Sequence, residues 1–448
     1  MPRRTRDRAA ARAHDTEIAR LALPAFAALI SEPLFLLADA AIVGHLGVAQ
    51  LAALGIAATV LQTVVGLFVF LAYGTTSTVA RNVGAGDQRA ALSSGIDGMW
   101  LSLVIGALAS GLVLAFTPVV VGGFAPTPAV HDFAVTYLRI AALGVPALLL
   151  MFAATGVLRG LQDTRTPLYI AVAANLANIV LNVLFVYGLD WGIAGSALGT
   201  LAAQGAAAIV LAYVVVRGAR RLSASLAPHL SGVRTAWRIG VPLMLRTLTL
   251  RATLLIATYV AASLSTTSLA AHQVAFTVWT FLTFALDAIA IAGQAITGRL
   301  LGAGDAVGAR AATRRMLGWG AVSGVALGML LVAVRPLVVP LFSPDADVQE
   351  LLSAVLIVVA LHQPVSGIVF VLDGVLIGAG DGRYLAVAGV VTLLAFAPMA
   401  FAVLWLGGGL VWLWWAFTAF MVIRMLTLLW RERSDDWLVL GATTPARR

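Results

Sequence analysis

The stretch Val157-Leu158-Arg159-Gly160-Leu161-Gln162-Asp163-Thr164-Arg165 decides the fold, because its Gly, Asp and Arg return 218 residues later at Gly378, Asp381 and Arg383. Gly84-Ala85-Gly86-Asp87 returns at the same offset as Gly302-Ala303-Gly304-Asp305. Chance aligns some Ala and Leu in so apolar a chain, but composition does not explain aligned Gly, Asp and Pro. The chain is therefore two copies of one bundle. The aligned prolines are Pro24 and Pro242, Pro118 and Pro336, Pro126 and Pro344, and Pro146 and Pro364.

The composition places both copies in a membrane. The 448 residues are 61% hydrophobic and 11% charged, which is too little polar surface for a water-soluble protein of this length. Apolar stretches recur at about the 20 residues that a helix needs to cross a bilayer, and they lack the alternation of a β-barrel. We predict an all-α polytopic membrane protein with twelve transmembrane helices, near 21–44, 51–75, 93–117, 134–155, 168–188, 193–216, 239–262, 269–294, 314–334, 351–376, 385–405 and 410–430.

The charge pattern predicts the orientation. All 29 basic residues are Arg, and they concentrate on alternate connections and both chain ends, whereas the opposite connections are short and nearly uncharged. The Arg-rich side is expected to be cytoplasmic. We therefore expect a multi-pass protein of the cell membrane with both termini in the cytoplasm. The same pattern, with anionic lipid headgroups as partners, accounts for a pI near 10.8 without nucleic acid.

The repeat also predicts the domain organisation. Six crossings in each copy return the chain to the same side, so the repeats run parallel and are expected to enclose a central cleft. The expected parts are a cytoplasmic tail at 1–20, an N-lobe at 21–216, a linker at 217–238, a C-lobe at 239–430 and a second tail at 431–448. The first tail lacks the features of a signal peptide and is expected to be disordered to about residue 15.

Several motifs resemble the multidrug and toxic compound extrusion (MATE) family. They are the Pro-containing first span with Asp39 and Gly44-His45-Leu46, the Gly84–Asp87 loop and the 157–164 stretch. The resemblance covers about residues 20–430, with the motifs in order. It implies a secondary active antiporter that exports organic, often cationic, compounds by alternating access in exchange for protons or sodium. Three further motifs resemble the DinF branch: Met244-Leu245-Arg246, Ala285-Leu286-Asp287 and Val371-Leu372-Asp373-Gly374.

One alternative within the same superfamily is a flippase for lipid-linked precursors. Such proteins typically add two helices and a strongly basic cavity, whereas this chain predicts twelve helices and mixed charges. Enzymes form a separate class. The sequence has no Cys, no pair of His at metal-binding helical spacing, no nucleophile elbow and no phosphate loop. We therefore expect no catalytic residues, no metal site and no cofactor, and a monomer whose partners are small organic substrates and the lipid bilayer.

Carboxylates inside the first span are the leading candidates for ion coupling. A charge at the bilayer centre costs about 2.5–3.5 kcal/mol on insertion scales, so it should be paired, hydrated or neutralised. Glu32 lies seven residues before Asp39, almost two helical turns away on nearly the same face. The resemblance implies that Asp39 is the coupling carboxylate. A structural hydrogen bond to a neighbouring helix is the alternative for both residues.

Prolines and asparagines complete the candidate site of the first repeat. Pro24 and Pro33 remove backbone hydrogen bonds and predict a kink in the first span, either static or, as the resemblance implies, one that bends on protonation. Asn178 and Asn182 share a helix face, where they either bind the coupling ion or hydrogen-bond a neighbouring helix. Some relatives carry Asp where this chain has Asn182, which weakens the case for a sodium site and favours protons.

The second repeat carries a different set of charges. Arg246 and Arg251 lie near mid-depth, and each needs a carboxylate or water. Asp287 and Asp373 are available, and Arg246 matches their depth better. These residues form either internal ion pairs or part of the substrate cleft. Gln294 and Gln363 are expected to line a cavity, and His272 to lie near the outer surface. Trp residues around the last outer loop are expected to be membrane-interface anchors: Trp405, Trp412, Trp414 and Trp415.

Overall fold

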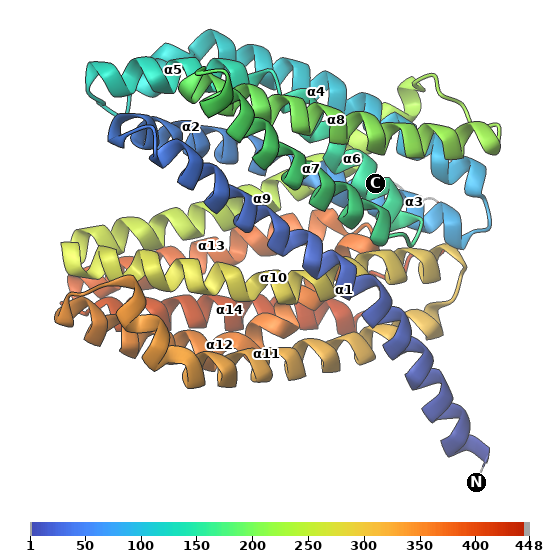
Figure 1. Cartoon of the computed structure of the whole chain (residues 1–448). Coiled ribbons are helices and arrows are strands. Elements are labelled where there is room, and N and C mark those ends of the chain that lie inside the picture. Colours follow the sequence, from blue (N-terminus) through green and yellow to red (C-terminus); the bar gives the residue numbers. More distant parts are fainter. Residues whose placement is uncertain (1, 443–448) are drawn as a thin grey trace. The chain divides into compact units, whose positions relative to one another are not determined.

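The structure, a computed structural model, describes residues 2–442, with side chains from residue 12 onward except that of residue 13. All regular elements in this described part are helices (Figure 1). The first repeat contains α1 (Pro2–Gly44), α2 (Val48–Leu67), α3 (Phe70–Gly84), α4 (Gln88–Gly122), α5 (Pro128–Ala142), α6 (Val145–Gly160), α7 (Arg165–Val183), the π-helix η1 (Leu184–Gly188) and α8 (Gly192–Arg221). The second contains α9 (Leu230–Leu264), α10 (Thr266–Gly302), α11 (Ala306–Phe342), α12 (Ala346–Gly378), α13 (Gly382–Trp405) and α14 (Leu410–Arg433).

The predicted twelve spans are confirmed. Within the described residues, 11 spans are long and apolar enough to cross a membrane, and the pair α5 and α6, bent by 44°, makes the twelfth. The first repeat is the more broken of the two, because α2 and α3 are separated at Phe68–Val69 and α5 and α6 at Leu143–Gly144. Their counterparts in the second repeat, α10 and α12, are each continuous.

The repeated Gly-Ala-Gly-Asp loops have one structure in both copies. Gly86 and Gly304 adopt φ of 80° and 78°, a left-handed conformation that a side chain would disfavour. The following Asp then caps the next helix, because Asp87 accepts a hydrogen bond from the backbone N–H of Ala90, and Asp305 from that of Gly308. These loops are therefore turns with helix caps.

Helix packing repeats as well. Gly160 of α6 lies so close to α3 that a Cβ there would stand 2.9 Å from the carbonyl oxygen of Thr76. Its counterpart Gly378 of α12 lies equally close to α10, with a Cβ 2.8 Å from the Cα of Gln294. Small residues allow such backbone approach between membrane helices. The 218-residue sequence repeat is thus also a repeat of close helix–helix contacts.

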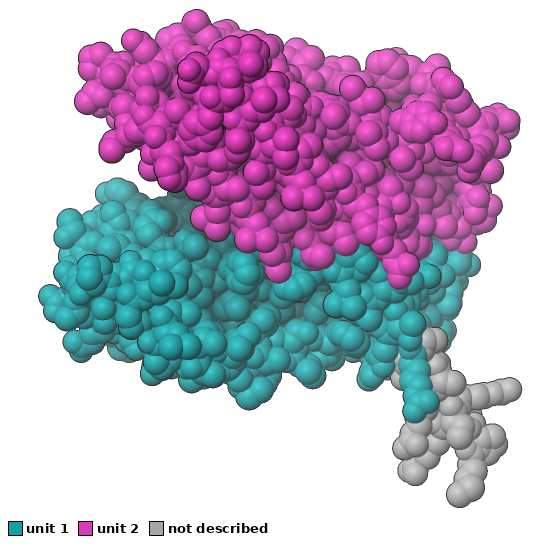
Figure 2. Space-filling model, viewed as in Figure 1, with its two compact units in different colours: residues 1–26, 241–448 teal, residues 27–240 magenta. Residues whose placement is uncertain are grey.

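The chain forms two compact units (Figure 2). Unit 2 is Ala27–Gly240, and unit 1 combines the chain up to Phe26 with the chain from Val241 onward. Both boundaries fall inside helices, α1 and α9. Among the segments expected to be non-helical, 2–20 continues α1, and only residues 222–229 separate α8 from α9.

Contacts with α10 and α11 explain why the start of α1 belongs to unit 1. Asp15 accepts hydrogen bonds of 2.6 Å from Nε and Nη2 of Arg315, and one of 2.8 Å from Trp319 Nε1. Glu17 pairs with Arg299 at 2.6 Å, and Ile18 is buried. The expectation of a disordered lead-in to about residue 15 is wrong for residues 2–15, because the helix already begins at Pro2 and these contacts hold Asp15.

Candidate functional site

The Asp39 cluster, made of Asp39, Tyr137, Asn182 and Ser196, lies inside unit 2. Helix α1 supplies Asp39, which is only 4% exposed. Its Oδ1 accepts hydrogen bonds from Asn182 Nδ2 of α7 at 2.8 Å and from Ser196 Oγ of α8 at 2.7 Å. Its Oδ2 accepts one from the Tyr137 hydroxyl of α5 at 3.5 Å. Three helices thus direct neutral donors at one buried carboxylate on a fourth helix.

A second layer of polar contacts holds these donors in place. Asn178, one turn before Asn182, donates from Nδ2 to Thr200 Oγ1 of α8 at 3.0 Å. Gly199 lies against Asn182, where any Cβ would overlap the amide oxygen. The Oδ1 atoms of Asn178 and Asn182 are buried and have no hydrogen-bond partner among the described residues. The amide of Asn182 is therefore oriented with its NH₂ toward Asp39.

This geometry suits a carboxylate that gains and loses a proton. An ionised carboxylate only accepts hydrogen bonds, and three donors compensate its burial. A protonated carboxyl must donate one, so one of the surrounding groups has to turn. Ser196 can do this by rotating its hydroxyl, and Asn182 by turning its amide oxygen inward. Protonation thus changes the pattern that joins α1 to α7 and α8.

The other candidates on α1 lie apart from this cluster. The side chain of Glu32 is exposed, and no hydrogen bond or ion pair joins it to any described residue. Glu32 and Asp39 lie on nearly the same face of α1. Only the side chain of Asp39 is hydrogen-bonded by residues of α5, α7 and α8. Pro24 and Pro33 both lie inside α1, which stays one helix through them.

In unit 1, the structure brings two arginines to one carboxylate. Asp373 of α12 accepts a hydrogen bond from Arg246 Nη2 of α9 at 2.7 Å and from Arg424 Nη2 of α14 at 2.8 and 2.9 Å. The side chains of Asp373 and Arg424 are 7% and 3% exposed. Buried charges need such partners, so this trio holds three helices together.

The remaining candidates of the second repeat differ in their burial. Arg251 is exposed and has no ion pair among the described residues, while Asp287 is half-buried. Gln294 and Gln363, at 1% and 0% exposure, lie in the packed interior of unit 1. The expectation that Trp414 is a membrane-interface anchor is wrong, because it is 3% exposed in an aromatic cluster, whereas Trp405, Trp412 and Trp415 are exposed. His272 is also 3% exposed and belongs to the same cluster.

Four side chains of these two clusters are not predicted from the sequence. Tyr137, Ser196 and Thr200 lie in spans rich in small and apolar residues, where hydroxyl groups are common packing elements. Arg424 had a clear signal, because it is the one charged residue between 410 and 430.

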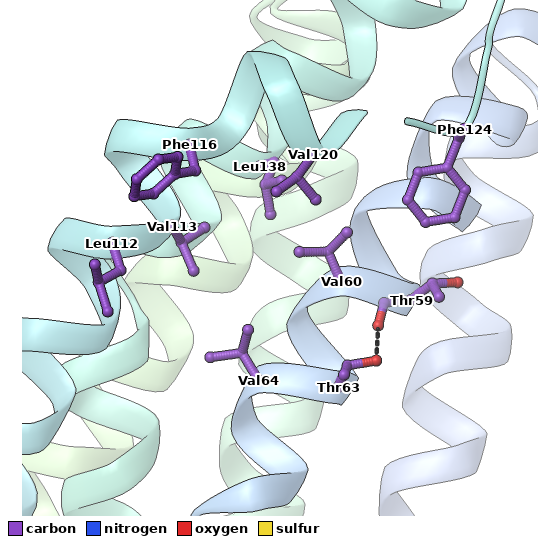
Figure 3. A pocket seen from close by; sticks show the side chains of 10 residues that line it. All are labelled: Thr59, Val60, Thr63, Val64, Leu112, Val113, Phe116, Val120, Phe124 and Leu138. Carbon is purple, nitrogen blue, oxygen red and sulfur yellow. Dashed lines mark hydrogen bonds between the residues drawn. The ribbon is translucent and has the colours of Figure 1, made fainter. Parts of the chain in front are cut away.

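An apolar groove of about 490 Å³ lies elsewhere in unit 2, between α2 and α4 (Figure 3). Its lining is apolar apart from Thr59 and Thr63, whose hydroxyls bond backbone carbonyls one turn earlier. None of its lining residues is ionisable, so it offers hydrocarbon contacts but no coupling chemistry.

A family model named MatE matches the chain twice, over residues 24–184 and 242–402, at the same 218-residue offset. The chain belongs to the MatE family. The family consists of membrane transporters for multidrug and toxin efflux. The resemblance drawn from the motifs is thereby confirmed.

Relatives and solved structures agree with this assignment. The chain is 30% identical to the DNA damage-inducible protein F of Escherichia coli over 94% of each chain, which confirms the DinF branch. It is also 30% identical to the chloroplastic protein DETOXIFICATION 44 of Arabidopsis thaliana, over 95% of this chain and 84% of the relative. The fold matches the Vibrio cholerae MATE transporter VcmN with a TM-score of 0.87 at 21% identity, over 96% of this chain and 99% of that one.

Proposed function

We propose that this protein is a secondary active antiporter that exports organic, often cationic, compounds by alternating access in exchange for protons. The observation that carries the proposal is the Asp39 cluster, a lone buried carboxylate held by three neutral donors from three other helices. Because the donors are neutral, no ion pair balances the charge of Asp39. Binding of one proton therefore changes the net charge of the whole cluster from −1 to zero.

Protonation then biases the conformation of the protein. The ionised carboxylate binds its three donors best in the closed cluster, whereas the neutral carboxyl loses part of that hydrogen-bonding energy. Hydrogen bonds to charged groups contribute about 1.5–3 kcal/mol each, which is enough to shift a balance between two conformations that differ by a few kcal/mol. A proton bound from outside and released inside can in this way drive the export cycle.

Protons are favoured over sodium by the orientation of the amides. A sodium ion needs several converging oxygen ligands, but Asn182 presents its NH₂ group to Asp39 and leaves its oxygen turned away. No group of three or more His, Asp and Glu that could hold a metal ion occurs among the described residues. Sodium would require both amides to turn over, whereas a proton requires one hydroxyl to rotate.

The proposal includes the cellular setting. The Arg-rich connections support a cell-membrane protein with both termini in the cytoplasm. The transporter is proposed to act as a monomer without a cofactor, and its partners are the bilayer and small organic molecules.

Everted membrane vesicles that accumulate ethidium, a flat organic cation, test this function. Uptake should stop when the proton gradient is collapsed and should continue when sodium is omitted. Asp39→Asn should abolish it, while Asp132→Asn, at a carboxylate that is 85% exposed, should leave it unchanged. Uptake that follows a sodium gradient would show that sodium, not the proton, is the coupling ion. Movement of lipid-linked precursors without ethidium transport would favour the flippase instead.

A further inference from the structure

The second repeat carries different chemistry at the place equivalent to the Asp39 cluster. Moving 218 residues along the chain replaces Asp39 by Ala257, Asn178 by Phe396 and Ser196 by Trp414. Thr200 becomes Thr418 and so keeps its hydroxyl. Asn182 becomes Ala400, so this place lacks the carboxylate and both amides and holds the aromatic rings of Phe396 and Trp414.

The rings of two histidines contact Trp414 at this place. The His272 ring of α10 lies 5.7 Å from the Trp414 ring, and the His362 ring of α12 lies 6.3 Å from it, stacked at 11°. Phe417 contacts His362, and Phe276 stacks on His272. His272, His362 and Trp414 are 3%, 0% and 3% exposed. Two of the six histidines of the chain thus contact one buried indole ring.

Hydrogen bonds define where each ring carries its proton. Thr418 donates its hydroxyl hydrogen to the carbonyl of Trp414, and Thr258 donates to that of Leu254. A hydroxyl has one hydrogen, so with that hydrogen engaged each Thr oxygen accepts from the nearby imidazole nitrogen, at 3.3 Å. This arrangement puts the N–H groups at His272 Nε2 and His362 Nδ1.

The second nitrogen of each ring is left with a free lone pair. His272 Nδ1 and His362 Nε2 are buried and have no hydrogen-bond partner among the described residues. A buried acceptor without a partner costs about 1–3 kcal/mol, so two of them in one cluster call for a reason. Each is a site to which a proton can add.

Each carboxylate on α10 and α12 lies at least 11 residues along its helix from the histidine of that helix. Asp373 follows His362 by 11 residues on α12, about 16 Å along the helix, and Asp287 follows His272 by 15 residues on α10. No ion pair joins either ring to a described carboxylate. The other titratable or charged groups on these helices are Arg234, Arg238, Arg246, Arg251 and Tyr259 on α9, Arg299 on α10, Arg310, Arg314, Arg315 and Arg335 on α11, Asp347 and Glu350 on α12, Arg383 and Tyr384 on α13, and Arg424, Arg431, Glu432 and Arg433 on α14.

We propose that His272 and His362 form a second proton-binding site, at the repeat-equivalent of the Asp39 cluster, whose protonation opens the aromatic packing around Trp414. The inference rests on the proposed proton-coupled export and adds a site to it. Neutral rings suit the closed cluster, because a positive charge is costly in an apolar interior. A charged ring gains from water and from the face of the indole. The two rings share one indole, so the second proton binds less readily than the first.

Ring titration tests the site directly. The full chain, labelled with ¹⁵N-histidine in lipid nanodiscs, is titrated from pH 8.5 to 4.5, and the signals are assigned with His272→Gln and His362→Gln. We expect both rings to titrate in this window with separate midpoints, and the midpoint of the remaining ring to rise when the other is replaced. His45→Gln, at an exposed helix end, should change neither midpoint. Rings that both stay neutral to pH 4.5 overturn the proposal.

Acrylamide quenching of tryptophan fluorescence tests the link to opening. Trp414→Phe identifies the contribution of Trp414, which should become accessible at pH 5 and stay shielded at pH 7.5. In His272→Gln/His362→Gln, the quenching should no longer depend on pH. Quenching of Trp414 that is the same at both pH values contradicts the opening. Both measurements are repeated in Asp39→Asn, where the rings should still titrate, so failure of this site is distinct from failure of coupling at Asp39.

Discussion

The two repeats share their packing but treat a buried carboxylate in opposite ways. Asp39 of the first repeat is held by neutral donors, whereas Asp373 of the second is held by two guanidinium groups. Neutralising Asp39 removes a charge from an otherwise uncharged cluster. Neutralising Asp373 leaves two buried arginines facing each other. The first arrangement permits a cycle of protonation, and the second keeps its charge fixed.

The comparison shows that the two copies kept the same turns and helix packing, whereas the polar residues between their helices differ. Helix caps and glycine contacts recur because backbone geometry tolerates few substitutes at those positions. The polar interiors had no such restriction, since a carboxylate, an aromatic ring or an ion pair can each fill the space between helices. The two copies could therefore take on different polar chemistry at equivalent places.

The largest effect on transport is expected from Asp39→Asn. Asparagine keeps the size of the side chain but cannot exchange a proton, so gradient-driven export should fall to the passive leak. The amount of folded protein and its melting temperature should stay near wild type. Ethidium transport in proteoliposomes with an imposed pH gradient measures this, and transport at the wild-type rate would refute the role of Asp39.

Replacing Asp373 should instead act on stability. Asp373→Asn leaves Arg246 and Arg424 without their shared carboxylate, which should cost about 3–5 kcal/mol. Arg424→Met should cost less, and Arg246→Met least, because the Arg246 side chain is more exposed, at 11% against 3%. Thermal unfolding in detergent measures the series, and Asp373→Asn/Arg424→Met should recover part of the loss.

Drug affinity in the same variants separates structure from binding. If the trio is structural, ethidium affinity should remain near wild type in every variant that folds. Weaker ethidium binding by Asp373→Asn at unchanged melting temperature would instead assign Asp373 to the substrate site. Strictly additive stability losses would show that the three residues do not act together.

A smaller effect is expected from Ser196→Ala. Removing one donor weakens the ionised form of Asp39 by about 1.5 kcal/mol, so the pH of half-maximal export should rise by about one unit. The pH profile of proton-driven ethidium transport measures the shift. The matched variant Ser102→Ala, at a buried serine of α4 that bonds a backbone carbonyl, should leave the profile in place.

The smallest effect belongs to Arg251→Gln. The side chain is exposed and has no ion pair among the described residues, so unfolding should change by less than about 0.5 kcal/mol. The contrast with Arg246→Met, on the same helix, isolates the value of pairing with Asp373. A large loss of stability in Arg251→Gln would show that exposure does not separate the two arginines.

Sequence alone predicted the repeat, the twelve spans and the position of Asp39, because these depend on hydrophobic length and on rare residues at fixed offsets. It did not predict the partners of Asp39, since the rotation of each helix about its axis depends on packing that periodicity leaves open. Ser196 therefore looked like one more small residue. His272 and Trp414 looked like surface groups because they lie near the ends of apolar segments, although the neighbouring helices bury both.

The division of α1 between the two units has a consequence for biosynthesis. Its first 26 residues belong with a body whose other members begin at Val241. When the ribosome has finished the first repeat, Asp15 and Glu17 still have no Arg315 or Arg299 to meet. The first helix to enter the membrane is thus among the last to complete its contacts, and its amino-terminal part has to wait for the second half of the chain.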